Sequence, residues 1–229
     1  MGREKDIRAS ASRRSCPVRE FFYWINERHR IYLKKAAGEP KPWTQDVILQ
    51  RYKFTNVFRQ LDRGTMWLTE HLIQPHYADA DQALLLFNVV VYRMFNWWPT
   101  GKFLGYITWW EKEKTQARLL ARRKTGAQIF TGAHILRGEF GVSKIESHCR
   151  VLTRVWADRK QILRRLGEGK TLVAAFEVFL EYPYIGPFLA YEFVTDLRHT
   201  RILGNAPDTM SWANAGPGAR RGLLRLFPV

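Results

Sequence analysis

The chain has 229 residues, of which 46% are hydrophobic, and its 37 Lys and Arg residues outnumber 21 Asp and Glu to give a net charge of +16. This length allows one large domain or two small lobes, and the charge makes nucleic acid a better expected partner than a membrane. Two cysteines far apart exclude a disulfide framework or zinc site, and the longest apolar stretch, 84–98, is interrupted by Asn88, Arg93 and Asn96, which excludes a membrane span.

The first half of the chain reads as helices separated by short loops. Residues 1–16 are expected to form a flexible basic tail without the apolar core of a signal peptide. Pro17 suits a first helical turn and Gly38 a helix stop, so a helix is predicted over 17–37. The two prolines of 38–44 exclude helix, and Thr44 is expected to cap the next one. Further helical periodicity covers 47–52, 57–73 and 82–97, the last starting near Asp79 and Asp81.

The second half continues the helical pattern. A long, very basic helix is predicted over 108–124, a glycine-rich stretch over 126–141, and helices over 143–166, 172–181 and 187–198. A small strand pair near 128–136 is left open. The prediction is an all-α fold in which residues 17–229 form a single helical catalytic domain, with two lobes as an alternative.

Residues 182–190, Tyr-Pro-Tyr-Ile-Gly-Pro-Phe-Leu-Ala, resemble a helix-hairpin-helix, whose turn presents backbone N–H groups to a DNA phosphate. Gly186 occupies a matching position, but Tyr184 replaces the first glycine and Pro187 removes one donor. An ordinary turn between two helices is the competing interpretation.

Asp208 follows this hairpin at the spacing of the essential aspartate in helical DNA glycosylases, which the chain resembles here. In that interpretation it faces an extruded nucleotide, and the residues 209–212 begin a helix. The alternative is a simple helix cap.

Two segments are candidates for holding phosphate or a base. Residues 216–222 combine Gly216 and Gly218, which allow close backbone approach, with Arg220 and Arg221, which can fork onto phosphate oxygens. A charged loop is the competing interpretation. Residues 41–59 mix cations, aromatics and amides, so that Trp43 and Phe54 can stack on a base, Asn56 can read its edge, and Lys53 and Arg59 can hold phosphates.

Several segments, in order over about residues 20–225, together resemble a known family, the α-glutamyl/putrescinyl-thymine pyrophosphorylases, or amino acid:DNA transferases, of bacteriophages. The matching segments are Glu27-Arg28 with Lys34 and Gly38; Pro-Lys-Pro-Trp-Thr-Gln-Asp at 40–46; Tyr-Lys-Phe-Thr-Asn-Val-Phe-Arg at 52–59 with Asp62-Arg63; Arg93 with Asn96; Phe-Thr-Gly-Ala-His at 130–134; 184–192 with Asp196-Leu197-Arg198; and 216–222. The family is regarded as a derived relative of the helical glycosylases, so the resemblance implies a glycosylase-like fold with the hairpin.

The resemblance implies an enzyme that replaces pyrophosphate on 5-pyrophosphoryloxymethyl-uracil in DNA with an amine from an amino acid or polyamine, in the host cytoplasm. A carboxylate is then expected to take a proton from the amine or anchor its ammonium form. The candidates for this role are Asp208 and, as alternatives, Asp196, Glu192 and Asp46. The residues expected to bind pyrophosphate and substrate are Arg28, Lys34, Trp43, Asn56, Arg59, Arg63, Arg220 and Arg221. The residues expected to contact DNA are Tyr184, Gly186, Gly216, Gly218 and Trp212.

Other interpretations stay open at this stage. A DNA glycosylase that excises a modified base would also use an aspartate and a flipped nucleotide, and a non-catalytic DNA-binding protein needs only the charge and the hairpin. The six histidines have no metal-ligand spacing, so no metal or cofactor is expected. The protein is expected to act as a monomer on DNA, with a free amino acid or polyamine as its second substrate.

Overall fold

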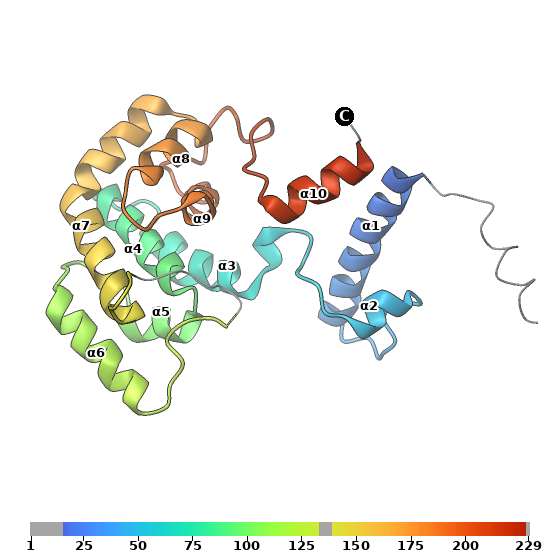
Figure 1. Cartoon of the computed structure of the whole chain (residues 1–229), viewed down its shortest axis with the longest axis horizontal. Helices are drawn as coiled ribbons and strands as arrows, with labels where there is room; N and C mark the ends of the chain where they lie inside the picture. The colour runs from blue at the N-terminus through green and yellow to red at the C-terminus, as the bar shows by residue number, and fades with distance from the viewer. Residues whose placement is uncertain (1–15, 133–138, 228–229) are drawn as a thin grey trace, which may run out of the picture. The chain divides into compact units, whose positions relative to one another are not determined.

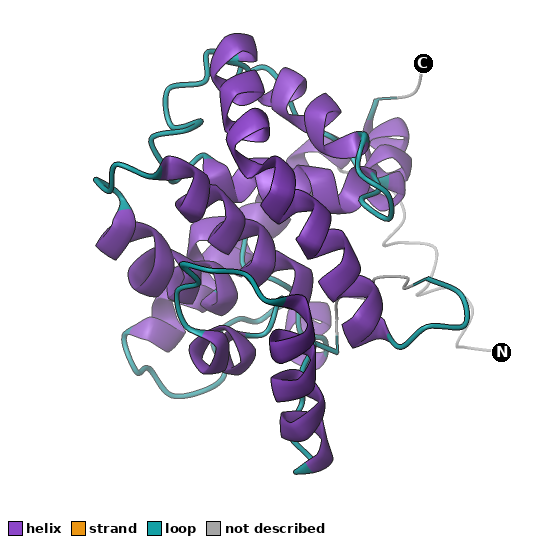
Figure 2. Cartoon of the chain, turned by 90° about the vertical axis from the view of Figure 1, so that its left-hand side faces the viewer, coloured by secondary structure: helices purple, strands orange, loops and turns teal. Residues whose placement is uncertain are grey.

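The computed structural model describes residues 16–132 and 139–227, and within these ranges every regular element is a helix (Figures 1 and 2). The predicted all-α class is therefore confirmed. Residues 128–132 form no strand, while the rest of the suggested strand pair and the tail 1–15 lie outside the described residues. No helix of the described ranges is both long enough and apolar enough to cross a membrane.

The chain divides into two compact units, residues 1–62 with 217–229 and residues 63–216. The first unit contains α1 (Pro17–Ala36), α2 (Val47–Arg51), the short 3₁₀ helix η1 (Arg59–Leu61) and α10 (Pro217–Leu226). The second contains α3 (Arg63–Leu68), the single-turn helices η2 (Thr69–Ile73) and η3 (Gln74–His76), α4 (Gln82–Phe95), α5 (Trp98–Leu104), α6 (Lys112–Lys124), α7 (Lys144–Gly169), α8 (Leu172–Leu180) and α9 (Pro187–Leu197).

Helix α4 is the centre of the second unit. It is mostly apolar, and its residues from Leu85 to Phe95 are all buried, including the polar Asn88 and the charged Arg93. The helices α7 and α9 pack against it, and α6 packs on α7 (Figure 1). Helix α7 is amphipathic and turns Ile145, Leu152 and Ile162 inward. The second unit thus has one continuous hydrophobic core.

Several predicted boundaries are confirmed. Pro17 is the first residue of α1, and Gly38 follows its end with a φ of +73°, a conformation that glycine adopts without strain. Asp81 caps α4 by accepting hydrogen bonds from the N–H groups of Ala83 and Leu84. The helices predicted at 143–166, 172–181 and 187–198 correspond to α7, α8 and α9.

Other predictions are wrong in informative ways. The helix expected over 57–73 begins only at Arg63 and follows the short η1 turn, and the helix expected from 108 begins at Lys112. Asp46 caps α2 in place of Thr44, whose hydroxyl instead accepts a hydrogen bond from the Asp46 N–H. Residues 209–212 form turns and no helix.

The glycine-rich segment 216–222 is also not a loop. Its residues from Pro217 onward are the first turns of α10, with Pro217 in the first turn and Arg220 and Arg221 on the exposed surface of the helix. The segment therefore does not present the backbone of a phosphate-binding loop over most of its length.

Candidate functional site

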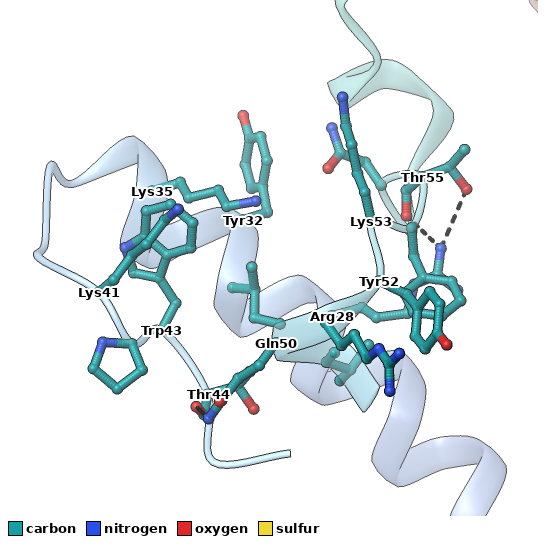
Figure 3. Close-up of a pocket in the computed structure, with 16 residues that line it drawn as sticks. Arg28, Tyr32, Lys35, Lys41, Trp43, Thr44, Gln50, Tyr52, Lys53 and Thr55 are labelled. Atoms are coloured by element: carbon teal, nitrogen blue, oxygen red, sulfur yellow. Dashed lines mark hydrogen bonds between the residues drawn. The ribbon is translucent and has the colours of Figure 1, made fainter. Parts of the chain in front are cut away.

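A cavity of about 460 Å³ lies within the first unit, between α1 and the segment 41–56 (Figure 3). Its volume is within the range of sites for small ligands. From α1 it is lined by Arg28, Ile31, Tyr32 and Lys35, and from the following segments by Lys41, Pro42, Trp43, Thr44, Leu49, Gln50, Arg51, Tyr52, Lys53, Phe54, Thr55 and Asn56.

The lining contains five cationic side chains and no carboxylate. Of these, Lys35, Lys41 and Lys53 have no ion-pair partner among the described residues. Cations that share a cavity repel one another unless an anion neutralises them, and partial exclusion of water strengthens their attraction for one. The cavity is therefore electrostatically suited to an anion.

Aromatic rings hold four of the five cations in place. The ammonium groups of Lys35 and Lys41 lie 4.6 and 5.1 Å from the centroid of the Trp43 ring, so both border the same indole (Figure 3). Similarly, the Arg51 guanidinium lies 5.5 Å from the Tyr52 ring and that of Arg28 lies 5.8 Å from the Phe54 ring. Cation–π contacts restrict the cations without neutralising their charge.

Hydrogen bonds back to α1 and its C-terminal turn fix the loop that carries Trp43. The indole N–H of Trp43 donates to the Glu39 carbonyl at 2.7 Å, and Lys34 Nζ donates to the Trp43 carbonyl at 3.1 Å. The Thr44 hydroxyl donates to a Glu27 carboxylate oxygen at 2.7 Å. These bonds turn the chain back over α1 after Gly38, which places the Trp43 ring beside Lys35.

The other wall is fastened in the same manner. Arg28 donates through Nη2 to both the carbonyl and the hydroxyl oxygen of Thr55 (Figure 3). The side-chain amide of Asn56 donates to the Leu61 carbonyl. Tyr52 and Phe54 are 55% and 39% exposed as whole residues, while Trp24 packs edge-on against the Phe54 ring, so both remain partly accessible to a flat ligand.

The substrate-binding residues predicted from the sequence fall into two groups. Arg28, Trp43 and Asn56 line the cavity, and Lys34 supports the Trp43 backbone. The remaining residues lie away from the cavity lining: Arg59 in η1, Arg63 in α3 with its guanidinium 5.0 Å from the Trp98 ring, and Arg220 and Arg221 on α10.

The Asp208 carboxylate binds backbone N–H groups of α8. One of its carboxylate oxygens accepts the Leu172 N–H at 2.7 Å and the other accepts the Val173 N–H at 3.0 Å. It therefore caps α8, 36 residues earlier in the chain, in addition to the cap supplied by Thr171. Asp208 is therefore a helix cap, but it caps the preceding helix α8 and not a helix that begins at 209.

The alternative acids are also engaged. Asp196 is fully buried and forms a bidentate ion pair with Arg93, with distances of 2.6 and 2.8 Å. Glu192 lies 3.4 Å from the same guanidinium, which also donates to the Asn96 side chain at 2.7 Å. Asp46 accepts the N–H groups at the start of α2. Each carboxylate thus has a structural partner, and none of them lines the cavity.

In the segment of the predicted hairpin, helices α8 and α9 are joined by residues 181–186 and pack against each other, an arrangement that an ordinary turn between two helices also gives. Tyr184 is 53% exposed and adopts a φ of +63°, and Gly186 is the N-cap of α9. Trp212 is half-buried against the rings of Phe176 and Tyr191, so it contributes to packing.

The sequence interpretation assigned no site role to three cations of the cavity, Lys35, Lys41 and Arg51, while it named Lys53 as a possible phosphate contact. Lys41 belongs to the Pro-Lys-Pro-Trp segment, whose aromatic and basic composition was the available signal. No cluster of three or more metal-ligating side chains occurs in the parts of the chain that the structure describes.

Comparison with known proteins gives one family. A family model described as "5-hmdU DNA kinase, helical domain" matches residues 16–229. A 5-hmdU DNA kinase of Bacillus phage SP10 is 30% identical over 227 aligned residues, which cover 90% of this chain and 36% of the relative. The chain therefore spans about a third of the relative's length. No solved structure matches the chain.

These matches confirm the setting of phage DNA hypermodification that the sequence motifs implied. They do not confirm the thymine pyrophosphorylases as the family within it, because the matching model is that of the kinases' helical domain.

Proposed function

The chain belongs to the family of 5-hmdU DNA kinase helical domains, and we propose that it binds DNA containing 5-hydroxymethyluracil. In this proposal, the modified nucleotide is held in the cavity of the first unit. The cavity is the observation that supports the proposal most strongly. It combines aromatic rings with five cations and no carboxylate, a lining that is complementary to a base bearing phosphate.

In this proposal, aromatic side chains bind the base and cationic side chains bind its phosphate. The partly exposed rings of Tyr52 and Phe54 receive the flat base, and stacking of this kind stabilises a bound base by about 1–3 kcal/mol. Lys35 and Lys41, which flank Trp43, neutralise a phosphate ester on the hydroxymethyl oxygen. A base can reach an enclosed site only outside the stack, so the nucleotide is extruded from the duplex.

We further propose that the reaction supported by the site is amine transfer. The bond between the hydroxymethyl carbon and its oxygen breaks, and pyrophosphate leaves with the electron pair. An amine nitrogen forms a bond to that carbon and releases a proton. Fixed cations stabilise the negative charge that develops on the leaving group, and this is the contribution of Lys35 and Lys41.

The placement of the acids limits this proposal in a useful way. Asp208 holds backbone N–H groups, and Asp196 and Glu192 hold the Arg93 guanidinium. The cavity is therefore assigned the binding of the nucleotide and the stabilisation of pyrophosphate, and the proton of the amine is assigned to none of these carboxylates.

The hairpin α8–α9 belongs to the same proposal as a contact to the DNA backbone, in the manner of a helix-hairpin-helix in a glycosylase-like domain. Supporting this role, its turn is exposed at Tyr184, and Gly186 opens the N-terminal end of α9.

Binding to matched duplexes tests the nucleotide site. The probes are one duplex with a single central 5-hydroxymethyluracil, the same duplex with its phosphate ester, and the same duplex with thymine. Replacing both lysines by glutamine (Lys35→Gln, Lys41→Gln) should remove most of the preference for the phosphate ester. Arg30→Gln is the control, since Arg30 lies on α1, is exposed, and does not line the cavity. Equal effects of the two variants would refute the site.

Nucleoside analysis tests the reaction. DNA with pyrophosphorylated hydroxymethyluracil is incubated with the protein and a pool of amino acids and polyamines, then digested and examined by mass spectrometry. The proposal predicts nucleosides with nitrogen on the thymine methyl carbon and released pyrophosphate. Free base with abasic sites would indicate a glycosylase instead, and unchanged nucleosides would restrict the domain to binding.

A further inference from the structure

The helix α6 carries its charges unevenly. In its first turn and just before it, Lys112 pairs with Glu113 at 3.0 Å and Lys114 pairs with Glu111 at 3.2 Å. Its second half carries four cations and no acid: Arg118, Arg122, Arg123 and Lys124. These four side chains, here called the α6 cationic patch, have no ion-pair partner within residues 16–132 and 139–227.

Two arginines of the patch are held in place by one ring. The guanidinium groups of Arg118 and Arg122 lie 4.9 and 4.8 Å from the centroid of the Phe103 ring. Arg118 also donates from Nη2 to the Phe103 carbonyl at 3.1 Å. Residues four apart on a helix are neighbours on one face, so the ring orders two adjacent planar cations.

The remaining donors of these arginines are unused. Arg122 Nε is buried and makes no hydrogen bond within the described residues, and most N–H groups of both guanidinium ions have no protein acceptor there. The planar fork of a guanidinium matches two oxygens of a phosphate. Two guanidinium groups ordered on a common ring can bind phosphate oxygens through their remaining N–H groups with little loss of side-chain entropy.

The helix dipole accounts for only part of this arrangement. Cations in the last turn favour a helix end, which applies to Arg122, Arg123 and Lys124. Arg118 lies a full turn earlier, and neither its stacking on Phe103 nor its bond to the Phe103 carbonyl is required by the dipole. The buried face of α6, with Thr115 and Leu119, is turned toward the protein, and α6 packs on α7 (Figure 1).

We propose that the α6 cationic patch is a further DNA contact, which binds the phosphate backbone of the duplex without regard to base sequence. The choice of DNA as the polyanion rests on the proposed function. The contact itself is independent of the modified base, because backbone phosphates are the same in modified and unmodified DNA.

The test is a salt series of equilibrium binding with two duplexes, one containing thymine and one containing 5-hydroxymethyluracil. The double variant Arg118→Gln, Arg122→Gln is compared with the double variant Lys112→Gln, Lys114→Gln. Both lose two positive charges from the same helix, but only the second pair of residues has carboxylate partners.

The arginine variant should bind both duplexes at least about ten-fold more weakly at 0.1 M salt, and its log–log salt slope should fall by about two. The preference between the duplexes should stay unchanged. The lysine variant should stay within about two-fold of the parent protein. Equal losses in the two variants would overturn the proposal.

A charge-preserving variant separates the ordered arrangement from bulk charge. The double variant Arg118→Lys, Arg122→Lys keeps the charge but loses the planar fork, so an intermediate loss is expected. Wild-type affinity in this variant would refute the role of stacking on Phe103. A loss of preference for the duplex with the phosphate ester, by contrast, is the signature of the cavity variants, so the two proposals fail separately.

Discussion

Removal of the Asp196 carboxylate should destabilise the second unit strongly, because its partner Arg93 would be left buried. Both side chains are nearly inaccessible, at 0% and 4% exposure, and the pair is joined by two short hydrogen bonds. Breaking a buried pair from one side costs about 3–5 kcal/mol. Since Glu192 and Asn96 still contact the guanidinium, we expect the Asp196→Ala variant to lose about 3 kcal/mol.

This loss corresponds to a fall in melting temperature of roughly 6–12 °C for a chain of this size. The assay is thermal unfolding followed by circular dichroism. The control is Glu181→Ala, which breaks the bidentate pair with Arg165 on the surface and should change the melting temperature little, because solvent screens an exposed pair. A double variant, Arg93→Met with Asp196→Leu, should recover part of the stability, because it removes both charges of the pair, although Glu192 then loses its contact with the guanidinium.

The same comparison distinguishes a structural from a catalytic Asp196. A catalytic carboxylate would lose turnover on substitution while the melting temperature stayed near that of the parent protein. If Asp196→Ala and Glu181→Ala melt at the same temperature, the assignment of Asp196 to structure is wrong.

Three further predictions concern the helical scaffold. Asp208→Ala should lower the unfolding free energy by about 1–2 kcal/mol, because it removes the second cap of α8. Asp208→Asn keeps one acceptor oxygen and should lose less. If both variants are as stable as the parent protein in urea titrations, Asp208 is not a cap. Gly101→Ala should destabilise by more than about 1 kcal/mol, since an added Cβ would lie 2.6 Å from the Trp67 ring, and an unchanged urea midpoint would contradict this contact. Burial raises the pKa of the Cys149 thiol to about 12, so the folded state favours the neutral thiol. The contribution of this thiol to the unfolding free energy is therefore full below about pH 9 and declines as the pH rises toward 12, by about 1 kcal/mol at pH 10. A Cys149→Ala variant should lack this pH-dependent decline in urea titrations.

Local rules identified most of the helices from the sequence. Pro17, Gly38 and Asp81 are start and stop signals whose physical effect depends on their immediate neighbours only. The helix predicted over 82–97 ends close to the observed end of α4, but α5 was missed, because no helix was predicted between 97 and 108. Asn96 ends α4 there with a φ of +48°, and its side chain accepts from Arg93, a contact that spacing alone does not reveal.

The helix α10 was missed for the opposite reason. Three glycines within 216–222 lower helix propensity, since each costs up to about 1 kcal/mol relative to alanine. Pro217 in the first turn and the apolar residues Leu223 and Leu224 nevertheless fit an amphipathic helix, and this pattern prevails in the structure.

The sequence predicted those cavity residues that stand out by local composition. It did not predict contacts between residues of α1 and residues of the loop that returns over α1. Trp43 was recognised as a stacking residue, but its partner Lys35 belongs to the preceding helix and reaches the ring only because the loop returns over α1. Asp208 shows the same limit, since its carboxylate binds Leu172, which no local pattern connects to it.

Photocrosslinking tests the central claim most directly. A duplex with 5-iododeoxyuridine at the position of the modified base is irradiated with the protein, and the crosslinked peptides are identified by mass spectrometry. If the cavity of the first unit holds the nucleotide, the crosslinks will fall on Trp43, Tyr52 or Phe54. Crosslinks confined to residues 63–216 would contradict the assignment of the nucleotide to this cavity.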